Sequence, residues 1–278
     1  MIKINYEKRW DNVKSSLGER DAFVAALPGN TRYLANSESP PGTPPSSTMN
    51  YVVIPKKSEP FAITSSLEEH RCRHESSVKD IRCWTTYPDI KSDGKSALEI
   101  LKSSLKEIKA KQIFTDTKVS LGRSFKVSVS SNVNELRSIK SKAELQRIKK
   151  AIKQSDAGQR FAYNLVESGE GLSEKEVRSE IDYFMARKGI QENSFSTIIA
   201  SGPNSAHSHH SNTDRKLKVG DPVICDFGVF WDGYCSDITR TYFVGGSPSD
   251  EWRKIYDIVM EANKRSTNAL VELSLIHI

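Results

Sequence analysis

Two aspartates beside a predicted β-hairpin turn are the residues best suited to chemistry. Asp226 and Asp237 lie on either side of Asp232-Gly233, a dipeptide that favours a two-residue turn between antiparallel strands. Counting outward from this turn places Asp226 opposite Thr239. Asp237 is two residues from Thr239 and therefore points to the same face of the sheet. We expect the two aspartates to be diagonal neighbours, with Cα atoms about 7–8 Å apart.

Carboxylates at such positions can hold metal ions. Two of them can share a pair of ions about 3.5–4 Å apart. Apolar residues such as Ile224 and Phe227 predict that these strands are largely buried. A buried aspartate is usually paired or coordinates a metal. The spacing thus indicates a metal site, but an ion pair with Arg240 or a half-exposed strand would also account for the aspartates.

The residues around the aspartates resemble a known family. The stretch Asp226-Phe-Gly, followed by Asp232-Gly-Tyr-Cys-Ser-Asp-Ile-Thr-Arg-Thr, is similar to the metal-binding hairpin of the pita-bread metallopeptidases. That family includes aminopeptidase P, prolidase and methionine aminopeptidase. The resemblance extends over about residues 140–270 and includes residues 199–209 and 213–221. It implies that Asp226 and Asp237 are the first two of five metal ligands.

The resemblance also implies a catalytic role for one histidine. His209 falls on the family's active-site histidine, which contacts the substrate near the metals and helps to handle protons. An unperturbed pKa near 6.5 suits this task. Pro203-Asn204 predicts a turn that would aim His209 into the cleft. His207 and His210 receive no role, because a cluster of three histidines is as compatible with a polar loop as with a metal site.

A dinuclear-metal hydrolase of peptides is the function that the resemblance implies. Two divalent ions would lower the pKa of a bridging water to about 7, and the hydroxide would attack the scissile carbonyl. Carboxylate ligands favour manganese, with cobalt or zinc as alternatives. Residues 31–34, Thr-Arg-Tyr-Leu, resemble a creatinase-type N-terminal domain. By analogy this points to a peptide substrate with proline at its second position, and so to an Xaa-Pro aminopeptidase or dipeptidase.

Two other functions stay open. One is a metal-free hydrolase like creatinase, and the other is a non-catalytic pita-bread module that binds peptides or proteins. Proteins of both kinds usually lack the metal aspartates, so Asp226 and Asp237 count against them. Titration with metal would separate the first function from both alternatives.

The remaining ligands of a pita-bread site, one histidine and two glutamates, have no evident counterparts. The acidic residues after Gly246 lie within or beside one predicted helix. Residues 273–278, Leu-Ser-Leu-Ile-His-Ile, resemble a translated sequencing adapter, so His277 is excluded as a ligand. We therefore expect an N-terminal fragment, with a metallopeptidase domain cut near its midpoint and no activity of its own.

Composition excludes several classes of protein. The chain has 278 residues, of which 37% are hydrophobic and 27% charged, as in an ordinary soluble globular protein. The net charge of +6 could suggest nucleic acid, but basic residues such as those in 140–153 follow helical faces and accompany no nucleic-acid motif. No apolar run approaches 18 residues, and no signal-peptide core is evident. We expect a cytoplasmic protein that binds neither nucleic acid nor membrane, with a homodimer as one option for its assembly.

The pattern of predicted elements indicates an α+β protein with two domains. Residues 1–130 alternate helices and strands, which predicts an α/β creatinase-like N-terminal domain. Residues 131–272 predict the first half of a pita-bread catalytic domain, with two helices, a strand over 195–201, the hairpin and a helix over 250–271. Capping boxes at Ser141/Glu144 and Ser173/Glu176 mark the starts of the first two helices.

Three smaller features complete the sequence-based prediction. The Pro-rich stretch 38–47 predicts a loop. His70 and His74 have the i, i+4 spacing of a chelating pair, but no third ligand accompanies them, so we interpret them as exposed. Cys225 and Cys235 are expected to be reduced and packed on the hairpin, because no CxxC pair is present.

Overall fold

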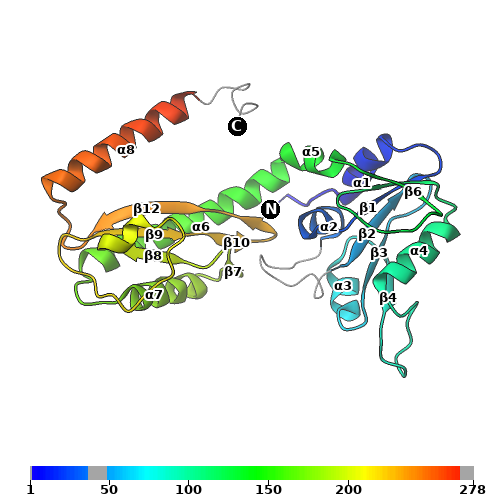
Figure 1. Ribbon diagram of the computed structural model, residues 1–278, viewed down its shortest axis with the longest axis horizontal. Helices are drawn as coiled ribbons and strands as arrows, with labels where there is room; N and C mark the ends of the chain where they lie inside the picture. The colour runs from blue at the N-terminus through cyan, green and yellow to red at the C-terminus, as the bar shows by residue number, and fades with distance from the viewer. Residues whose placement is uncertain (1, 37–48, 270–278) are drawn as a thin grey trace. The chain divides into compact units, whose positions relative to one another are not determined.

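The computed structural model describes residues 2–36 and 49–269, in two compact units (Figure 1). Unit 1 comprises residues 1–150 together with 230–234, and unit 2 comprises residues 151–229 and 235–278. Unit 1 is therefore discontinuous in sequence, because the turn of the predicted hairpin belongs to it. The division between residues 130 and 131 stays a prediction. The predicted loop at 38–47 and the segment 273–278 lie outside the described residues.

A six-stranded mixed sheet forms the centre of unit 1, with strand order β4-β3-β2-β1-β5-β6. The β1–β2 and β2–β3 pairs are antiparallel, and the other three pairs are parallel. The strands are β1 (Asp21–Ala25), β2 (Tyr51–Pro55), β3 (Phe61–Ser65), β4 (Asp80–Trp84), β5 (Gln112–Thr115) and β6 (Lys126–Val129). The helices are α1 (Tyr6–Ser15), α2 (Pro28–Ala35), α3 (Glu69–Glu75), α4 (Ala97–Glu107) and α5 (Asn132–Ser138).

Helices cover both faces of this sheet. One core cluster joins the sheet to α1, α2, α3 and α5 through residues such as Val13, Leu34 and Val133. The other joins it to α4 through Ile100 and Leu105. Strands β1, β2 and β3 are almost entirely buried between these layers, which is why they read as short continuous apolar runs rather than as alternating patterns. The predicted alternation of helices and strands in this region is confirmed.

Unit 2 contains a three-stranded antiparallel sheet, in the order β12-β9-β8. Its strands are β8 (Ile198–Ser201), β9 (Pro222–Phe227) and β12 (Ile238–Phe243), and its helices are the later part of α6 (Lys142–Glu167), α7 (Glu174–Arg187) and α8 (Asp250–Ala269). The short strands β7 (Glu192–Asn193), β10 (Val229–Trp231) and β11 (Tyr234–Cys235) form a second small sheet. Within the described residues, no helix is both long enough and apolar enough to cross a bilayer.

The start of α6 and the start of α7 confirm both predicted capping boxes. Ser141 and Glu144 exchange hydrogen bonds between side chain and backbone, and so do Ser173 and Glu176. Each box satisfies backbone N–H groups that have no partner within the helix.

Two local predictions are wrong. The strand predicted over 195–201 begins only at Ile198, because the Thr197 hydroxyl donates to the Asp182 carboxylate at 2.6 Å before the pairing with β9 starts. Cys235 is free but exposed rather than packed, because β11 is an edge strand of its sheet and has a neighbour on one side only. His70 and His74 are exposed, as expected.

A buried polar cluster holds the hairpin turn within unit 1. Arg9 forms an ion pair with Glu144 at 3.0 Å, and both side chains are almost fully buried. The Tyr234 hydroxyl accepts from Arg9 and donates to Glu144. Burial raises the pKa of Tyr234 to about 12, so this hydroxyl remains a donor. Arg147 pairs with Asp232 of the same turn at 2.7 Å.

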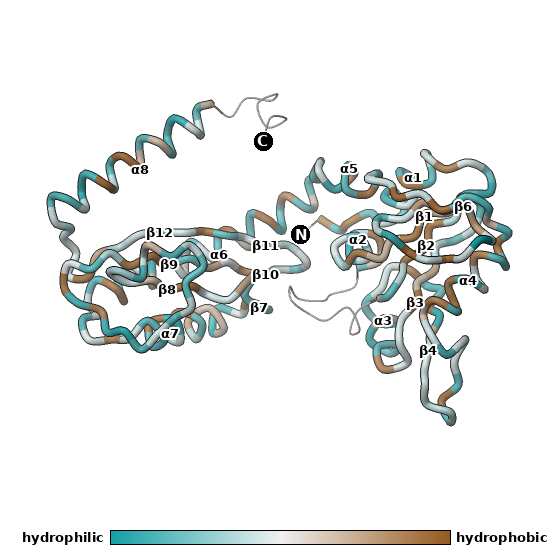
Figure 2. The backbone as a smooth tube through the Cα atoms, viewed as in Figure 1, coloured by the Kyte–Doolittle hydropathy of each residue, from teal (hydrophilic) through white to brown (hydrophobic). Residues whose placement is uncertain are grey.

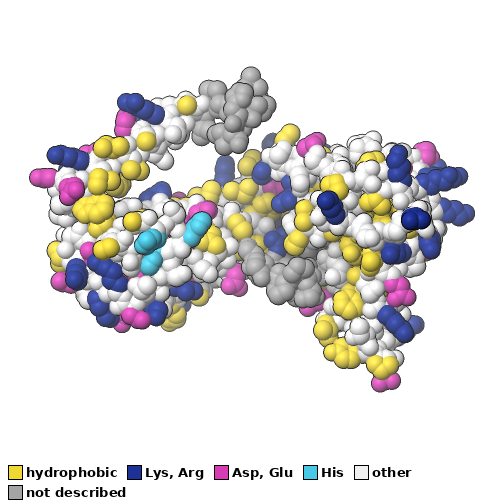
Figure 3. All heavy atoms as spheres, in the orientation of Figure 1, with side chains coloured by type: hydrophobic (Ala, Val, Ile, Leu, Met, Phe, Trp, Pro, Cys, Tyr) yellow, Lys and Arg dark blue, Asp and Glu magenta, His cyan; other side chains and the backbone are white. Residues whose placement is uncertain are grey.

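Helix α8 differs from the other long helices because none of its side chains is buried. Ile258, Val259 and Met260 are at least half exposed. Figure 2 colours several residues along α8 as hydrophobic, and Figure 3 shows hydrophobic side chains on its surface. Its helical structure therefore rests on local hydrogen bonds and helix propensity, which hold an isolated helix only marginally.

We accordingly predict fast amide exchange in α8. Amides of α8 should exchange at least about 100 times faster than those of the buried strands β1 and β2, because few buried contacts oppose its local opening. Hydrogen–deuterium exchange followed by mass spectrometry would measure the ratio. Equal protection of α8 and β1 would show that α8 is covered in solution.

Candidate metal centre

Strands β9 and β12 pair in the register that the turn predicted. Asp226 lies opposite Thr239, and Ile238 lies opposite Phe227. The Ser236 N–H donates to the Val229 carbonyl at 2.9 Å, so the same register continues to the turn without a bulge. Asp237 lies directly before β12 and two residues from Thr239. In this register it is diagonal to Asp226, as expected from the spacing.

The two faces of β9 differ in burial. Val223, Cys225 and Phe227 are buried beneath α6 and α7, whereas Ile224 and Asp226 on the other face are only partly buried. The prediction that both strands are largely buried holds for β9 but not for β12, whose residues are all partly buried or exposed. The difference between the two faces follows from the alternation of side chains along a strand, since only one face of this sheet packs against helices.

Asp226 and Asp237 form a pair of like charges. The Thr239 hydroxyl donates to Asp226 Oδ1 at 2.8 Å. Partial burial, followed by the charge and hydrogen bonding of Asp226, raises the pKa of Asp237 above its usual value. Arg240 donates to the carbonyl of Thr239, and no ion pair joins it to either aspartate in the described part of the chain. The structure thus gives no support to the Arg240 alternative.

This donor set fits a divalent cation. Two neighbouring carboxylates repel each other, and a bound cation would offset that repulsion. Oxygen ligands suit Mn²⁺, Mg²⁺ and related hard ions. However, no group of three or more His, Cys, Asp or Glu side chains that could hold a metal occurs within residues 2–36 and 49–269. The role of Asp226 and Asp237 as metal ligands therefore stays a prediction that needs further ligands.

Helix α6 fixes the strands that carry the aspartates. The side-chain amide of Gln159 donates to the carbonyl of Cys225 at 3.1 Å and to that of Ile238 at 2.7 Å. These carbonyls belong to the residues beside Asp226 and Asp237. The Ser155 and Ser236 hydroxyls are hydrogen-bonded at 2.7 Å, next to Asp237. Sequence analysis missed Gln159 and Ser155, which read there only as polar positions within a long helix.

Gly228 allows the two strands to approach closely. A Cβ at this position would lie 1.8 Å from the Ser236 carbonyl oxygen, which is backbone and cannot rotate away. The Ser194 hydroxyl donates to the same oxygen at 2.7 Å, which holds it in place. Glycine is therefore required at position 228, directly after β9. There the chain passes Ser236, the residue before Asp237.

We predict that Gly228→Ala destabilises unit 2 by at least about 2 kcal/mol, because the strands must separate to admit the methyl group. Chemical denaturation followed by circular dichroism would measure this change. Gly122→Ala is the control, since Gly122 has φ of 80° and no atom within 4 Å of an added Cβ. Gly122→Ala should lower the free energy of unfolding by only about 1–2 kcal/mol, because alanine is strained in a left-handed backbone conformation. Equal losses would show that the contact with Ser236 is unimportant.

A fully buried carboxylate organises the histidine segment. Glu174, at the start of α7, has no exposed surface and accepts six hydrogen bonds. The donors are the backbone and hydroxyl of Ser201, the amide of Asn204, His210 Nε2, and the backbone and hydroxyl of Thr213. Burial alone would raise its pKa, but these hydrogen bonds outweigh burial and lower the pKa to about 2.

The three histidines of this segment differ in environment. The His210 side chain is 8% exposed and lies 2.7 Å from Glu174 Oε2, so it has a structural role that the sequence did not reveal. His209 and His207 are exposed, and histidine side chains are visible on the surface in Figure 3. The described contacts include no hydrogen bond from His209 to Asp226 or Asp237. The catalytic role of His209 therefore stays a prediction.

Glu174 also makes stability depend on pH. Because its folded-state pKa lies below the usual value near 4.5, its stabilisation is complete above that value and is lost as pH falls toward 2. We predict that Glu174→Gln lowers the free energy of unfolding by about 2–4 kcal/mol at pH 7, since a neutral amide cannot accept the same six hydrogen bonds.

The difference between Glu174→Gln and the unsubstituted chain should shrink as pH falls from 5 to about 2. Denaturation at several pH values would measure it. Glu180→Gln provides the matched control, because Glu180 is an exposed glutamate of the same helix. A pH-independent difference would mean that the ionised state of Glu174 is irrelevant.

Comparison with known proteins identifies the second half of the chain. Residues 146–274 match metallopeptidase family M24. This stretch is therefore similar to the metallopeptidases of that family. The match includes Asp226, Asp237 and His209, and also Gln159 and Glu174. The M24 stretch thus contains both the predicted site residues and the side chains that hold them.

Relatives with known names agree with this assignment. The Xaa-Pro dipeptidase of Pyrococcus furiosus is 42% identical over 137 residues, which are 49% of this chain and 38% of that protein. The matched stretch therefore spans well under half of the length of that M24 relative.

Solved structures confirm the mixed α+β fold. The Xaa-Pro dipeptidase of Bacillus anthracis aligns with a TM-score of 0.77 and 27% identity, covering 96% of this chain and 72% of that one. A prolidase of Thermococcus sibiricus aligns with a TM-score of 0.78 and 28% identity, covering 98% and 74%. The predicted α+β class and prolidase-like arrangement are confirmed.

Proposed function

We propose that the protein acts as a metal-dependent peptidase on peptides with proline at the second position. The observation that carries this proposal is the pairing of β9 with β12, which brings Asp226 close enough to Asp237 to raise the pKa of Asp237. The M24 match and the similarity to Xaa-Pro dipeptidases support the same reaction class. Two manganese ions are the proposed cofactor, because hard carboxylate oxygens suit manganese.

In this proposal, the chain's own residues bind the metal ions and orient the substrate. Asp226 and Asp237 would hold the metal ions, which when bound supply an activated water and polarise the scissile carbonyl. Thr239 donates to Asp226 Oδ1 and so helps to orient this carboxylate. Gln159 fixes the backbone beside both ligands. His209 would contact the substrate and transfer a proton.

Two alternatives, a creatinase-like metal-free hydrolase and a non-catalytic binding module, remain distinguishable from this proposal. Neither requires a pair of facing carboxylates, and such a pair is costly unless a cation is bound or one carboxyl is protonated. Because the described residues supply only two ligands, we propose that this chain by itself binds Mn²⁺ weakly and does not hydrolyse peptides.

The test uses a protein that contains this sequence and hydrolyses an Xaa-Pro dipeptide. We predict that two substitutions in this protein have distinct effects. Asp237→Asn should abolish hydrolysis and Mn²⁺ binding, because a neutral amide is a poorer ligand. His209→Ala should lower turnover by about 10²–10⁴-fold and leave the metal content unchanged, because proton transfer is lost while the ligands remain.

Peptide hydrolysis and metal analysis of the purified protein would measure both effects. Asp257→Asn is the control, since Asp257 lies on the exposed helix α8. It should change neither rate nor metal content. Full rate and full metal content in Asp237→Asn would show that the hairpin is not the metal site, and the proposed function would then fail.

A further inference from the structure

Basic side chains gather at one end of the six-stranded sheet of unit 1, on the neighbouring strands β2, β1, β5 and β6. The backbone N–H of Lys111 donates to the Arg20 carbonyl at 2.8 Å, and that of Lys126 donates to the Lys111 carbonyl at 3.1 Å. On the other side of β1, the N–H of Lys56 donates to the Asp21 carbonyl at 3.1 Å. Since hydrogen-bonded strands lie about 4.8 Å apart, these basic residues form a row across the end of the sheet.

Two further lysines adjoin this row, one after β2 and one after α4. We call the whole surface the basic rim, which comprises Arg20, Lys56, Lys57, Lys109, Lys111 and Lys126. Figure 3 shows Lys and Arg side chains gathered on the part of unit 1 around α4 and β6.

A hollow of about 200 Å³ opens within the basic rim, beside the C-terminal end of α4. Rim residues such as Arg20 and Lys109 line it together with the apolar side chains of Pro55 and Ile108. Small-molecule sites typically have volumes of roughly 300–1,000 Å³. The hollow therefore suits one side chain of a larger ligand.

The two carboxylates that line the hollow are already engaged. Glu19 forms an ion pair with Lys57, and the hydrogen bond and charge of Lys57 lower the pKa of Glu19. Asp21 Oδ2 accepts the Gly18 N–H at 2.7 Å. Neither carboxylate is paired with Arg20, so the rim keeps an excess of positive charge.

Four basic side chains of the rim are exposed and unpaired. Within the described part of the chain, no ion pair or side-chain hydrogen bond engages Arg20, Lys109, Lys111 or Lys126. Like charges so close together repel each other, and a bound anion would offset the repulsion.

The backbone of Lys109 adds an independent indication. Lys109 has φ of 55° directly after α4, a left-handed conformation that glycine adopts without strain at the end of a helix. Strain of this kind is concentrated at functional sites. A lysine at this position carries into the hollow a charge that glycine would lack.

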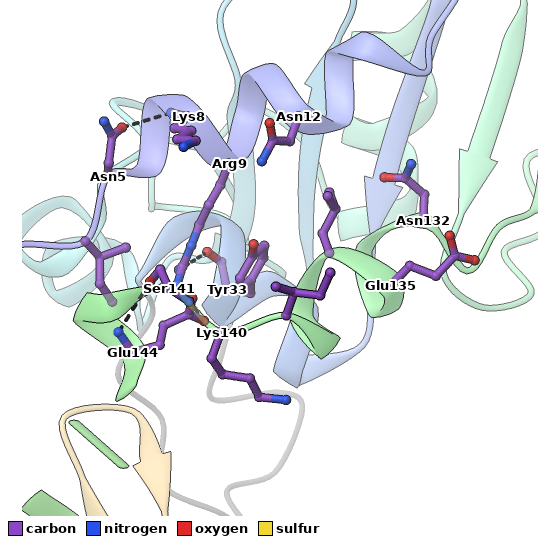
Figure 4. A pocket seen from close by; sticks show the side chains of 13 residues that line it. Asn5, Lys8, Arg9, Asn12, Tyr33, Asn132, Glu135, Lys140, Ser141 and Glu144 are labelled. Carbon is purple, nitrogen blue, oxygen red and sulfur yellow. Dashed lines mark hydrogen bonds and ion pairs between the residues drawn. The ribbon is translucent and has the colours of Figure 1, made fainter. Parts of the chain in front are cut away.

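The larger cavity of unit 1, shown in Figure 4, differs in this respect. Its Arg9 forms an ion pair with Glu144 at 3.0 Å, and both side chains are almost fully buried. Glu135, which also lines it, accepts from the Ser131 hydroxyl. These charges hold unit 1 together, whereas the four unpaired charges of the basic rim face solvent.

The dimensions and composition of the rim favour an acidic peptide over a nucleic acid. The row across the four strands spans about 14 Å, which an extended peptide covers with four or five residues at about 3.3 Å each. Single-stranded nucleic acids are bound through aromatic side chains on which the bases stack. Among the described residues, no aromatic side chain belongs to the rim or lines the hollow.

We propose that the basic rim binds an extended acidic segment of a partner protein. One glutamate of the segment enters the hollow, where its methylene groups contact Pro55 and Ile108 and its carboxylate reaches Arg20 or Lys109. Further carboxylates lie along Lys111 and Lys126. The surface is separate from the proposed metal site, because the whole rim belongs to unit 1 and both aspartates belong to unit 2.

Fluorescence anisotropy of dye-labelled octaglutamate, titrated with the chain in EDTA and about 25 mM NaCl, tests the proposal. We expect saturable binding with a dissociation constant below about 100 μM. Binding should weaken at least about tenfold at about 500 mM NaCl, because salt screens exposed charges. Labelled octaglutamine, which lacks the carboxylates, should not show saturable binding.

A labelled thymidine octanucleotide tests the choice of partner. It carries a similar negative charge and should bind at least about tenfold more weakly than octaglutamate, because the rim offers its bases no stacking platform. Equal or tighter binding of the oligonucleotide would overturn the proposal in favour of a nucleic-acid site.

Variants locate the site. Arg20→Gln with Lys109→Gln, and separately Lys111→Gln with Lys126→Gln, should each weaken octaglutamate binding by about tenfold or more. These side chains are exposed, so both variants should keep the melting temperature of the unsubstituted chain.

Lys142→Gln with Lys149→Gln is the matched control. It removes the same charge from exposed positions of α6 in unit 1, outside the rim, and should weaken binding by less than about twofold. Equal weakening in the control and the rim variants would show attraction to net charge alone and would overturn the proposal. Absence of saturable octaglutamate binding would overturn it as well.

Discussion

The register of β9 against β12 is the constraint on which the candidate metal centre depends. Side chains alternate along a strand, so a slip of one residue would turn Asp226 toward α6 and Cys225 toward solvent. Several contacts oppose that slip at once. Gln159 bonds a carbonyl on each strand, and Gly228 fits only where it passes Ser236. The position of the two carboxylates is thus set by hydrogen bonds and close packing on the opposite face of the sheet.

Glu174 fixes the conformation of the neighbouring segment, residues 201–213, in a comparable way. Burying a carboxylate costs several kcal/mol unless its oxygens are hydrogen-bonded, and here each oxygen accepts three hydrogen bonds. Nearby exposed ion pairs, such as Lys175 with Asp214, contribute about 1 kcal/mol or less. The conformation of residues 201–213 therefore depends mainly on one buried group, and His209 occupies the exposed part of the segment that this group holds.

Local signals in the sequence predicted the features that depend on interactions between residues close in sequence. The Asp232-Gly233 turn determined the hairpin register, and the two capping boxes marked the starts of α6 and α7. Features that depend on distant partners were missed. Nothing near Gln159 in sequence shows that its amide reaches two strands, and nothing near His210 shows that its partner is Glu174, because these pairs form only after folding. The exposure of Cys235 follows from an edge position, which is likewise a property of the assembled sheet.

The discontinuity of unit 1 has a consequence for synthesis of the chain on the ribosome. Arg9 and Glu144 are buried as an ion pair that also bonds the hydroxyl of Tyr234, which emerges 90 residues after Glu144. Until then the unit lacks the turn at 230–234, and this pair lacks its two hydrogen bonds with the Tyr234 hydroxyl. Contacts of such long sequence separation form late, because closing a long loop costs chain entropy. The N-terminal unit can therefore complete its packing only when much of the M24 stretch has already been made.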